Sequence, residues 1–456
     1  MLTKTDFKIY MEAPMHLWAK VNDKYKVEFS QYDQHLAKQG YEVEALAREY
    51  ARRYIDKGVE FQKEFKYEQL LSKADITIGD SIYEVKSSTK IEKEDKYDVL
   101  FQYFVASKSS SVDRIYLLYL NKEYERKGDI NLKELFVVED MTEYVKKNLG
   151  LIEGLIAEAL IVLKSDTPRG LIECHKPKDC PCISLCHPNL PQYSIYDIAN
   201  SNEKKLRTLR EMGILDITDV PSTFKLSEKQ YKQIEVAKQN KPYINKDLIL
   251  KDIEDLKYPI HFLDYETYSW AIPKYENHKS YQNVVFQYSL HILEKSEEIS
   301  HKEFLSTTKD DPIKEVIEHL KNDVKGSGSI LVWNKKFEMG CNKEMARIYP
   351  IYFDFLEEIN SRIYDLGDIF SKQMYVDPKF KGSWSIKKVL PVLVPSLSYK
   401  EMEISNGTEA MVGWETLVYK NISEEEKNTL YKNMLRYCEL DTFAMIEIYK
   451  YLLTLF

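Results

Sequence analysis

Four short segments in the C-terminal half of the chain carry acidic side chains in an order that suits metal-dependent hydrolysis. Their polar residues are Asp264 and Glu266, then Asn334 and Glu338, then Asp365, and finally Tyr437 and Asp441. Carboxylate oxygens are ligands that Mg²⁺ and Mn²⁺ prefer, and a pair of such ions is a common solution for phosphodiester hydrolysis. The segments therefore predict a two-metal site whose ligands are Asp264, Glu266, Glu338 and Asp441.

The first acidic pair follows an apolar run, residues 259–263, which predicts a strand that leads into the site. Side chains two residues apart on a strand share one face. We therefore expect Asp264 and Glu266 to reach one metal ion together, while Tyr265 points to the other face.

The last pair lies in a segment with helical character, residues 428–453. Residues four apart on a helix are stacked neighbours, so Tyr437 and Asp441 would project into one cavity. We expect the carboxylate to hold metal and the tyrosine hydroxyl to position or polarise a water molecule.

These motifs resemble those of the DEDDy class of 3′–5′ exonucleases, which read Asp-x-Glu, Asn-x-x-Phe-Asp and Tyr-x-x-x-Asp. The resemblance implies an RNase H-like fold and two-metal hydrolysis in which Tyr437 orients the nucleophilic water. Glu338 stands where the family has aspartate, and its extra methylene changes the expected metal spacing. Asp365 would be a neighbour of the metal site or a cap at a strand end, and Lys387 would be a phosphate contact or a surface charge.

A second candidate site lies in the N-terminal third, where residues 74–86 read as a β-hairpin with a Gly-Asp-Ser turn. Glu84 and Lys86 share one strand face, and Asp75 lies on the partner strand. Two carboxylates can bind a divalent ion, and a lysine can stabilise the attacking water or the charged phosphate. An ordinary charged hairpin is the alternative interpretation.

Two helices are expected around this hairpin. A helix over residues 98–103 would cover the sheet and carry Gln102, and a helical run over residues 40–53 carries Glu44. This layout resembles the RecB-type PD-(D/E)XK nucleases. The resemblance implies catalytic roles for the two carboxylates and the lysine of the hairpin, a supporting role for Gln102 and an added metal ligand in Glu44.

Four of the six cysteines lie close together, at Cys174, Cys180, Cys182 and Cys186. Such clustering in an intracellular chain favours a metal or iron–sulfur site over disulfides. The spacing matches neither a standard zinc ribbon nor a ferredoxin, which leaves three alternatives: a 4Fe–4S cluster, a zinc ion, or a loop without metal. Cys341 and Cys438 lie in apolar stretches and are expected to be buried thiols.

RecB-type nucleases of the CRISPR-adaptation kind hold a 4Fe–4S cluster through one cysteine near the N-terminus and three after the nuclease core. The three later positions are matched here by Cys174, Cys180 and Cys186. The early one is not, because Ala13 stands where a cysteine is expected within residues 10–18. We expect a local residue to replace it: Cys182, His175 or His187.

The sequence divides into three parts. Residues 1–190 form the RecB-like module with the cysteine cluster, residues 191–255 a helical connector, and residues 256–456 the RNase H-like module. In the connector, a helix that ends at Gly213 precedes a helix over residues 228–239, an arrangement that weakly resembles a helix–hairpin–helix element. A plain helical linker is the alternative.

The chain as a whole resembles uncharacterised bacterial proteins that join a RecB-like nuclease module to a DEDD exonuclease-like module. The strings that carry this resemblance are Ser-Ile-Lys-Lys-Val-Leu-Pro at residues 385–391 and Tyr-Cys-Glu-Leu-Asp-Thr at residues 437–442. It implies two α/β modules, an N-terminal one of restriction-endonuclease-like fold and a C-terminal RNase H-like one.

Composition sets limits on class and location. A chain of 456 residues, of which 44% are hydrophobic, can build two or three domain cores. No apolar run approaches the length of a membrane span, and no apolar core follows the first residues as in a signal peptide, so we expect a cytoplasmic protein without a membrane partner. Because the net charge is −8, nucleic acid would have to bind at local lysine patches. The candidates are Lys335, Lys336, Lys379, Lys381, Lys387 and Lys388.

These features predict a metal-dependent nuclease acting on DNA or RNA, with exonuclease chemistry at the C-terminal site and a second nuclease site near the N-terminus. The alternative is a nucleic-acid-binding scaffold of a repair or defence complex, with one or both sites degenerate. Glu338 and the missing N-terminal cysteine favour the scaffold. A nucleotide phosphohydrolase that uses the same acids is a third possibility.

Overall fold

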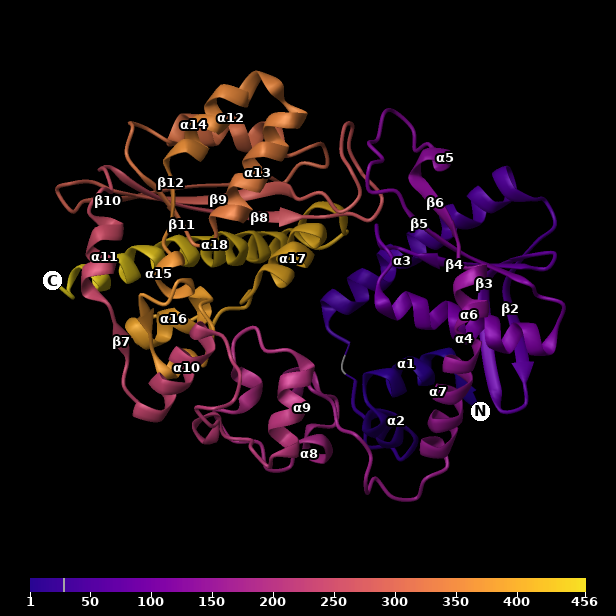
Figure 1. The fold of residues 1–456 in the computed structure, drawn as a ribbon. Helices are drawn as coiled ribbons and strands as arrows, with labels where there is room; N and C mark the ends of the chain where they lie inside the picture. Colours follow the sequence, from indigo (N-terminus) through magenta and orange to yellow (C-terminus); the bar gives the residue numbers. More distant parts are fainter. Residues whose placement is uncertain (28) are drawn as a thin grey trace. The chain divides into compact units, whose positions relative to one another are not determined.

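The computed structural model describes residues 1–27 and 29–456 (Figure 1). The chain forms two compact units, and each unit is made of two separate stretches of the sequence. Unit 1 comprises residues 1–189 and 270–282, and unit 2 comprises residues 190–269 and 283–456. Each unit is built from helices packed on a mixed β-sheet.

The sheet of unit 1 has the order β1-β3-β4-β5-β6, with β2 also paired to β3. Its strands are β1 (Leu2–Thr3), β2 (Val59–Tyr67), β3 (Leu70–Ile78), β4 (Ser81–Lys86), β5 (Arg114–Leu120) and β6 (Phe136–Asp140). Strand β3 is antiparallel to both β2 and β4, β4 and β5 are parallel, and β6 returns antiparallel to β5. The helices are α1 (Lys4–Glu12), α2 (Pro14–Val21), α3 (Gln31–Tyr50) with a π-turn at Ala51–Ile55, α4 (Lys93–Ser109), α5 (Leu132–Leu135), α6 (Thr142–Lys147), α7 (Leu149–Leu163) and α8 (Ile183–Cys186).

The hairpin between β3 and β4 is tight, since Ile78 pairs with Ser81 across a turn in which Gly79 has a φ of +57°. A left-handed backbone of this kind is easiest for glycine. Helix α4 is buried around its whole circumference from Asp98 to Ala106, and the ring of its Phe101 stacks on Phe7 of α1 at 5.0 Å between centroids. Helix α4 therefore packs on the sheet and also on the N-terminal helix α1.

Residues 270–282 belong to unit 1 although they lie between two strands of unit 2 in the sequence. Ala271 is 1% exposed within a core cluster of unit 1, and its backbone N–H donates a hydrogen bond to Gln39 of α3. The guanidinium of Arg126 donates to the carbonyl of Pro273 at 3.2 Å. The segment thus completes the core of unit 1.

The sheet of unit 2 has the order β10-β9-β8-β11-β12. Its strands are β8 (Ile260–Tyr268), β9 (Val284–Leu293), β10 (Ile299–Leu305), β11 (Ile330–Val332) and β12 (Ile363–Asp365). Strands β8, β9 and β10 are antiparallel neighbours, whereas β11 runs parallel to both β8 and β12. Strand β8 is therefore central, where the antiparallel and parallel halves meet.

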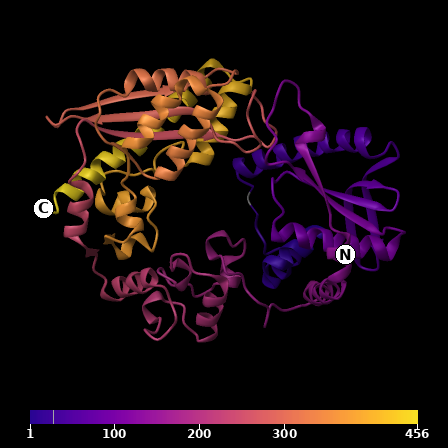
Figure 2. The ribbon, with the colours of Figure 1, turned by 45° about the horizontal axis from the view of Figure 1, so that its top comes forward.

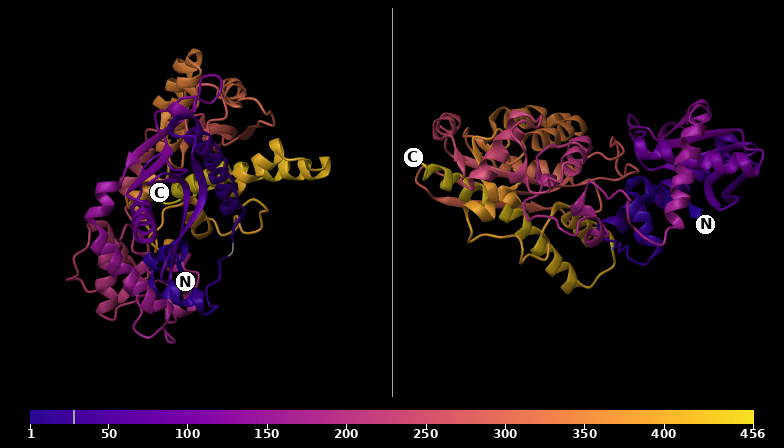
Figure 3. Two further views of the ribbon diagram at one scale, coloured as in Figure 1. Left: turned by 90° about the vertical axis from the view of Figure 1, so that its right-hand side faces the viewer. Right: turned by 60° about the horizontal axis from the view of Figure 1, so that its bottom comes forward.

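Helices cover both faces of this sheet. Helices α12 (Ile313–Asp323), α13 (Lys335–Ile348) and α14 (Phe353–Arg362) lie on one face, and α18 (Glu424–Leu453) crosses the other (Figures 1 and 2). Helix α18 is continuous over 30 residues, and it has the colours of the yellow end of the bar in Figure 3. Further elements are α15 (Asp368–Ser371), α16 (Ile386–Leu393), α17 (Gly407–Tyr419) and a small antiparallel pair of β7 (Tyr243–Ile244) with β13 (Tyr375–Val376). Because β9 is buried along its full length and β8 along most of it, polar residues on these strands need a specific reason.

Residues 190–255 form a small helical part of unit 2. It contains α9 (Glu203–Glu211), α10 (Glu228–Gln239) and α11 (Lys246–Ile253), with 3₁₀ turns at Ile195–Asp197 and Ile217–Asp219. Gly213, with a φ of +76°, ends α9 as a glycine C-cap does. This helical part has an apolar cluster of its own, which includes Leu209 and Ile234.

The mixed α/β class and the hairpin are confirmed, as are the helices expected at residues 40–53, 98–103, 228–239 and 428–453 and the helix expected just before Gly213. Helix α3 begins earlier than expected, at Gln31, and α18 begins at Glu424. The division into three domains stays a prediction. Among the residues that the structure describes, no helix is both long and apolar enough to cross a membrane.

Candidate functional site

Strand β8 places Asp264 and Glu266 together, as their spacing predicts. Their carboxylate oxygens lie within 4.8 Å of each other and of the Cys438 sulfur from α18. The intervening Tyr265 points to the other face, where its hydroxyl donates to Asn342 of α13 at 2.9 Å. A β-bulge follows Glu266, and bulges often re-aim side chains next to active sites.

Helix α18 brings Tyr437 and Asp441 to the same region, and both are buried. The Asp441 carboxylate accepts a hydrogen bond of 2.6 Å from the hydroxyl of Tyr399. The Lys387 ammonium donates to the Tyr437 hydroxyl at 3.1 Å and to the carbonyl of Ser405 at 2.7 Å. The tyrosine hydroxyl is thus held between a cation and the acidic cluster.

Glu338 lies in the first turn of α13 and is only 2% exposed. Among the described residues, its Oε2 atom has no hydrogen-bond partner. The turn itself is fixed by Asp365 at the end of β12, which accepts the backbone N–H of Lys335 at 3.0 Å, whereas the Asn334 side chain makes no capping bond. A buried carboxylate oxygen without a partner is costly, and it is the kind of atom that a metal ion would satisfy.

Electrostatics show how strongly these acids are crowded. Burial raises the pKa of Asp264 well above its usual value, and the charges of Asp441, Glu266 and Glu338 add to the effect. Burial also raises the pKa of Glu266 and of Glu338 to about 8. It raises the pKa of Asp441 to about 6, although tyrosine hydrogen bonds and the charge of Lys387 oppose it. A divalent cation among these oxygens would offset both the burial and the mutual repulsion.

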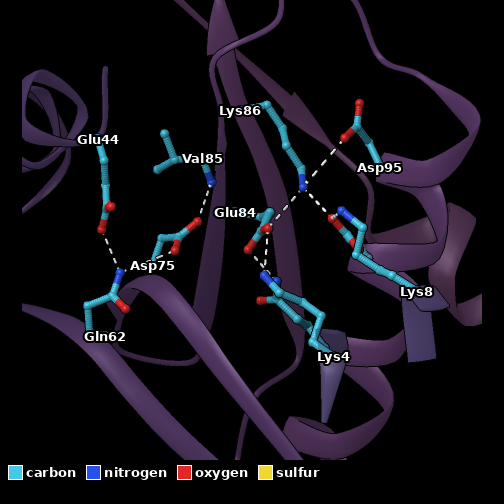
Figure 4. A network of polar contacts seen from close by, with 11 residues as sticks. Lys4, Lys8, Glu44, Gln62, Asp75, Glu84, Val85, Lys86 and Asp95 are labelled. Atoms are coloured by element: carbon cyan, nitrogen blue, oxygen red, sulfur yellow. Dashed lines mark hydrogen bonds and ion pairs between the residues drawn. The ribbon is translucent and has the colours of Figure 1, made fainter. Parts of the chain in front are cut away.

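The N-terminal candidate centres on Glu84, which is buried on β4 (Figure 4). Its carboxylate contacts the ammonium groups of Lys4 at 2.8 Å and Lys86 at 3.0 Å, and it accepts a hydrogen bond from Gln102. Lys86 also forms an ion pair with Asp98 of α4. Burial would raise the pKa of Glu84, but the two lysines outweigh it and hold the pKa below its usual value.

Asp75 lies beside Glu84 on the paired strand β3. It accepts the backbone N–H of Val85 at 2.9 Å, and Gln62 donates to it at 3.3 Å and to Glu44 of α3 at 2.5 Å (Figure 4). Burial and the neighbouring Glu84 charge raise the pKa of Asp75. Gln62 therefore links Asp75 of the hairpin to Glu44 in one polar network, and the roles of these acids as metal ligands stay predictions.

Sequence reasoning missed several residues of both sites. Lys4 is distant in sequence from the hairpin, Asp98 begins the helix expected over residues 98–103 but was given no role, and Tyr399 lies in a loop. Cys438 is buried as expected, but its sulfur lies 3.9 Å from an Asp264 oxygen. The sequence feature that could have indicated this contact is the position of Cys438 directly after Tyr437.

The cysteine segment folds back onto α2. The ligand atoms of four residues lie within 4.8 Å of one another: His16, Cys174, Cys180 and Cys186. His187 Nε2 lies 3.3 Å from the Cys174 sulfur, and the Cys182 sulfur lies 3.6 Å from that of Cys186. The fourth member of the group is thus His16, rather than Cys182, His175 or His187 as expected from the sequence.

Comparison with family models matches one part of the chain to a domain without a stated function. Residues 261–385 match the model of a domain of unknown function, DUF2779. This stretch carries Asp264, Glu266, Glu338 and Asp365, and it ends before Tyr437.

Similar proteins are uncharacterised. The chain is 29% identical over 289 residues to the uncharacterized protein UU173 of Ureaplasma parvum, an alignment that covers 57% of this chain and 41% of that protein. It is 30% identical over 207 residues to the uncharacterized protein MG366 of Mycoplasma genitalium, covering 41% of this chain and 31% of that protein. The chain therefore spans less than half the length of these relatives. No solved structure matches it.

Proposed function

We propose that this protein is a metal-dependent nuclease whose principal site is the carboxylate cluster around Asp264. The observation that carries the proposal is the convergence of acids from β8, α13 and α18 in a buried space, with one oxygen of Glu338 left without a partner. Acidic clusters of this kind suit two divalent cations and phosphodiester chemistry.

The topology of unit 2 supports an RNase H-like assignment. The strand order β10-β9-β8-β11-β12, with three antiparallel strands followed by two parallel ones, is the order expected of such a sheet. The first acidic pair lies on the central strand, and the tyrosine–aspartate pair lies on the helix across one face. This arrangement agrees with the DEDDy resemblance and with 3′–5′ exonuclease activity.

In this proposal Asp264, Glu266, Glu338 and Asp441 hold Mg²⁺ or Mn²⁺. When bound, such ions lower the pKa of water and neutralise charge on the phosphate. Tyr437 orients the attacking water, and its hydroxyl is itself positioned by Lys387 at 3.1 Å. Lys387 would also face a phosphate that enters the site, and its charge would stabilise the developing negative charge.

We further propose a second nuclease site in unit 1. The order α3-β2-β3-β4-α4-β5 supports a PD-(D/E)XK core. Asp75 and Glu84, with Glu44, would bind a divalent ion, and Lys86 would stabilise the attacking water. For Glu84 to bind metal, the Lys4 ammonium at 2.8 Å must give up part of its contact.

Cleavage of end-labelled single- and double-stranded DNA and RNA with Mn²⁺ tests both proposals. The variants are Asp264→Asn and Lys86→Ala, with Asp354→Asn on the exposed face of α14 as a matched control. A ladder that shrinks from the 3′ end and is lost only in Asp264→Asn assigns exonuclease activity to unit 2. Loss only in Lys86→Ala moves the chemistry to unit 1.

The alternative function is a nucleic-acid-binding scaffold. It is favoured by the glutamate at position 338 and by the ion pairs of Lys4 and Lys86 with Glu84, which already satisfy that carboxylate. Binding of nucleic acid without cleavage of any substrate would support it. Turnover of mononucleotides alone would instead indicate a phosphohydrolase.

A further inference from the structure

The group formed by His16 and three cysteines suggests a function that the nuclease proposal does not use. His16 comes from α2, whereas the cysteines come from the segment after α7, 158 to 170 residues later. The His16 Nε2 atom lies 3.5 Å from the Cys180 sulfur. His16, Cys174 and Cys186 are 4–5% exposed, and Cys180 is partly buried.

We propose that His16, Cys174, Cys180 and Cys186 bind one zinc ion. Zinc in structural sites is held tetrahedrally, with Zn–S distances of about 2.3 Å and Zn–N distances of about 2.0–2.1 Å. A tetrahedron with these bonds separates a nitrogen from a sulfur ligand by about 3.5 Å and two sulfur ligands by about 3.8 Å. The distance of 3.5 Å between His16 and Cys180 fits the first value, and all four ligand atoms lie within 4.8 Å of one another.

The same geometry does not fit a 4Fe–4S cluster. Each ligand of such a cluster binds a different iron, and the irons and sulfides occupy the space between the ligands. The ligands must therefore stand farther apart than four ligands that share one ion. Iron–sulfur clusters of this type also take four cysteines, and here the fourth position is a histidine.

A contact with Glu12 supports metal binding by His16. Its other ring nitrogen, Nδ1, lies 3.4 Å from a carboxylate oxygen of Glu12. A histidine that binds metal commonly donates its second N–H to a carboxylate, which fixes the ring and leaves the opposite nitrogen free for the ion. With Nδ1 protonated toward Glu12, the lone pair of Nε2 points to the three sulfurs.

The neighbouring groups have distinct roles in this proposal. The Nε2 atom of His187 lies 3.3 Å from the Cys174 sulfur, and with a proton on this nitrogen it would donate to the thiolate and stabilise it. Cys182 lies outside the group of four, although its sulfur is 3.6 Å from that of Cys186. Cys182 therefore serves as an internal control for any test of the ligands.

The site would fasten the end of unit 1 to its beginning. Zinc binding releases the thiol protons, and its free energy adds to the free energy of folding. The inference does not depend on the nuclease proposal, because it concerns different residues and needs no substrate.

Metal content and acid-labile sulfide of the purified full-length protein provide the first test, after expression with both iron and zinc in the medium. We expect one zinc ion per chain and no labile sulfide. Replacement of zinc by Co²⁺ should give thiolate-to-cobalt charge-transfer absorption, which carboxylate ligands cannot produce. Cys438→Ser should retain this absorption, which separates it from any ion bound beside Asp264.

Substitutions identify the ligands. Cys180→Ser and His16→Ala should lose the zinc, whereas Cys182→Ser should keep it. His16→Cys should also keep it, because a fourth thiolate can complete the tetrahedron. If the ligand variants do not fold, zinc stoichiometry and the cobalt spectrum of the wild type still decide.

Several results would overturn the proposal. One is a content of about four irons per chain with an equal amount of labile sulfide. Another is a protein that binds no metal when Zn²⁺ is supplied in excess, and a third is a cobalt spectrum without thiolate-to-cobalt absorption. Loss of zinc from Cys182→Ser with retention in His16→Ala would also refute it, because the ligand set would then be local.

Discussion

At the scale of single residues, Glu338 combines two properties that rarely occur together. It is 2% exposed, and one of its carboxylate oxygens has no hydrogen-bond partner among the described residues. Burial and the nearby Asp365 raise its pKa to about 8, so near pH 7 the acid is mostly neutral unless a cation is bound. A bound metal ion would therefore satisfy the unpartnered oxygen and stabilise the ionised form of the carboxylate.

Glu338→Gln should separate metal binding from folding. The amide resembles the neutral acid in shape, so the melting temperature without divalent ions should change little. The rise in melting temperature on adding Mn²⁺ should be reduced, with apparent affinity at least on the order of tenfold weaker, the smallest loss typical even for outer-shell partners of a metal. Thermal unfolding with and without Mn²⁺ measures both.

Glu344→Gln, farther along α13, is the control and should respond to Mn²⁺ as the wild type does. An unchanged Mn²⁺ response of Glu338→Gln would show that Glu338 is not a ligand of the proposed metal site.

Acid should destabilise unit 2 through His291. Burial, with the charge of His301, lowers the pKa of His291 to about 3, while the unfolded chain has the ordinary value of about 6.5. The unfolded state thus binds a proton that the folded state does not, and stability is complete above about pH 6.5. It should fall by on the order of 1.4 kcal/mol per pH unit between about pH 6.5 and 3.

Urea unfolding at several pH values measures this slope. His291→Gln should be less stable near pH 7.5, because the buried imidazole bonds to Thr442. Below pH 6.5 its unfolding free energy should depend less steeply on pH than that of the wild type, because its unfolding takes up about one proton fewer. His319→Gln, on the exposed face of α12, should retain the wild-type slope. Equal slopes in all three proteins would contradict the expectation.

At the scale of elements, the first turn of α13 depends on a neighbouring strand. Asp365 at the end of β12 accepts the Lys335 N–H, a role that an N-cap side chain normally fills. The strand therefore sets the position of the turn that carries Glu338.

Asp365→Ala should cost about 1 kcal/mol of stability, as the loss of a cap does, and should weaken Mn²⁺ binding by releasing the turn. Asp365→Asn keeps an acceptor without the charge and should restore the stability. If it also restores Mn²⁺ binding, Asp365 acts as a cap. If it restores stability alone, the charge of Asp365 itself contributes to the metal site. Chemical unfolding and Mn²⁺ titration distinguish these cases.

Sequence predicted those parts of the sites that depend on local spacing. Asp264 with Glu266, and Glu84 with Lys86, lie two apart on strands, so backbone geometry alone brings each pair together. Residues that meet through tertiary packing carried no such signal. His16 reaches Cys180 because α2 packs against a segment 164 residues away, and no local pattern encodes that contact.

At the scale of the whole molecule, unit 1 is not continuous in sequence. The segment 270–282 supplies Ala271 to its core, with Ile272 and Tyr281 packed beside it. This segment falls within residues 256–456, the range predicted for the C-terminal module, because in the sequence it lies between strands β8 and β9 of one sheet.

A fragment of residues 1–190 should accordingly be less stable than unit 1 in the full chain. Removal of the segment takes away Ala271 and exposes the apolar side chains that pack against it in unit 1. Addition of a synthetic peptide of residues 269–283 should therefore raise the melting temperature of the fragment. A scrambled peptide is the control. A fragment whose melting temperature the native peptide does not change would argue against this account.

The alternation between units has a topological consequence. The polypeptide passes from one unit to the other three times, after residues 189, 269 and 282. A protease that cuts once between residues 189 and 190 leaves a shorter piece whose partner segment is still covalently part of the longer one. The nicked protein should therefore migrate as a single species under native conditions and separate into two only in denaturant, and no one-step fission of its gene would yield two independently complete products.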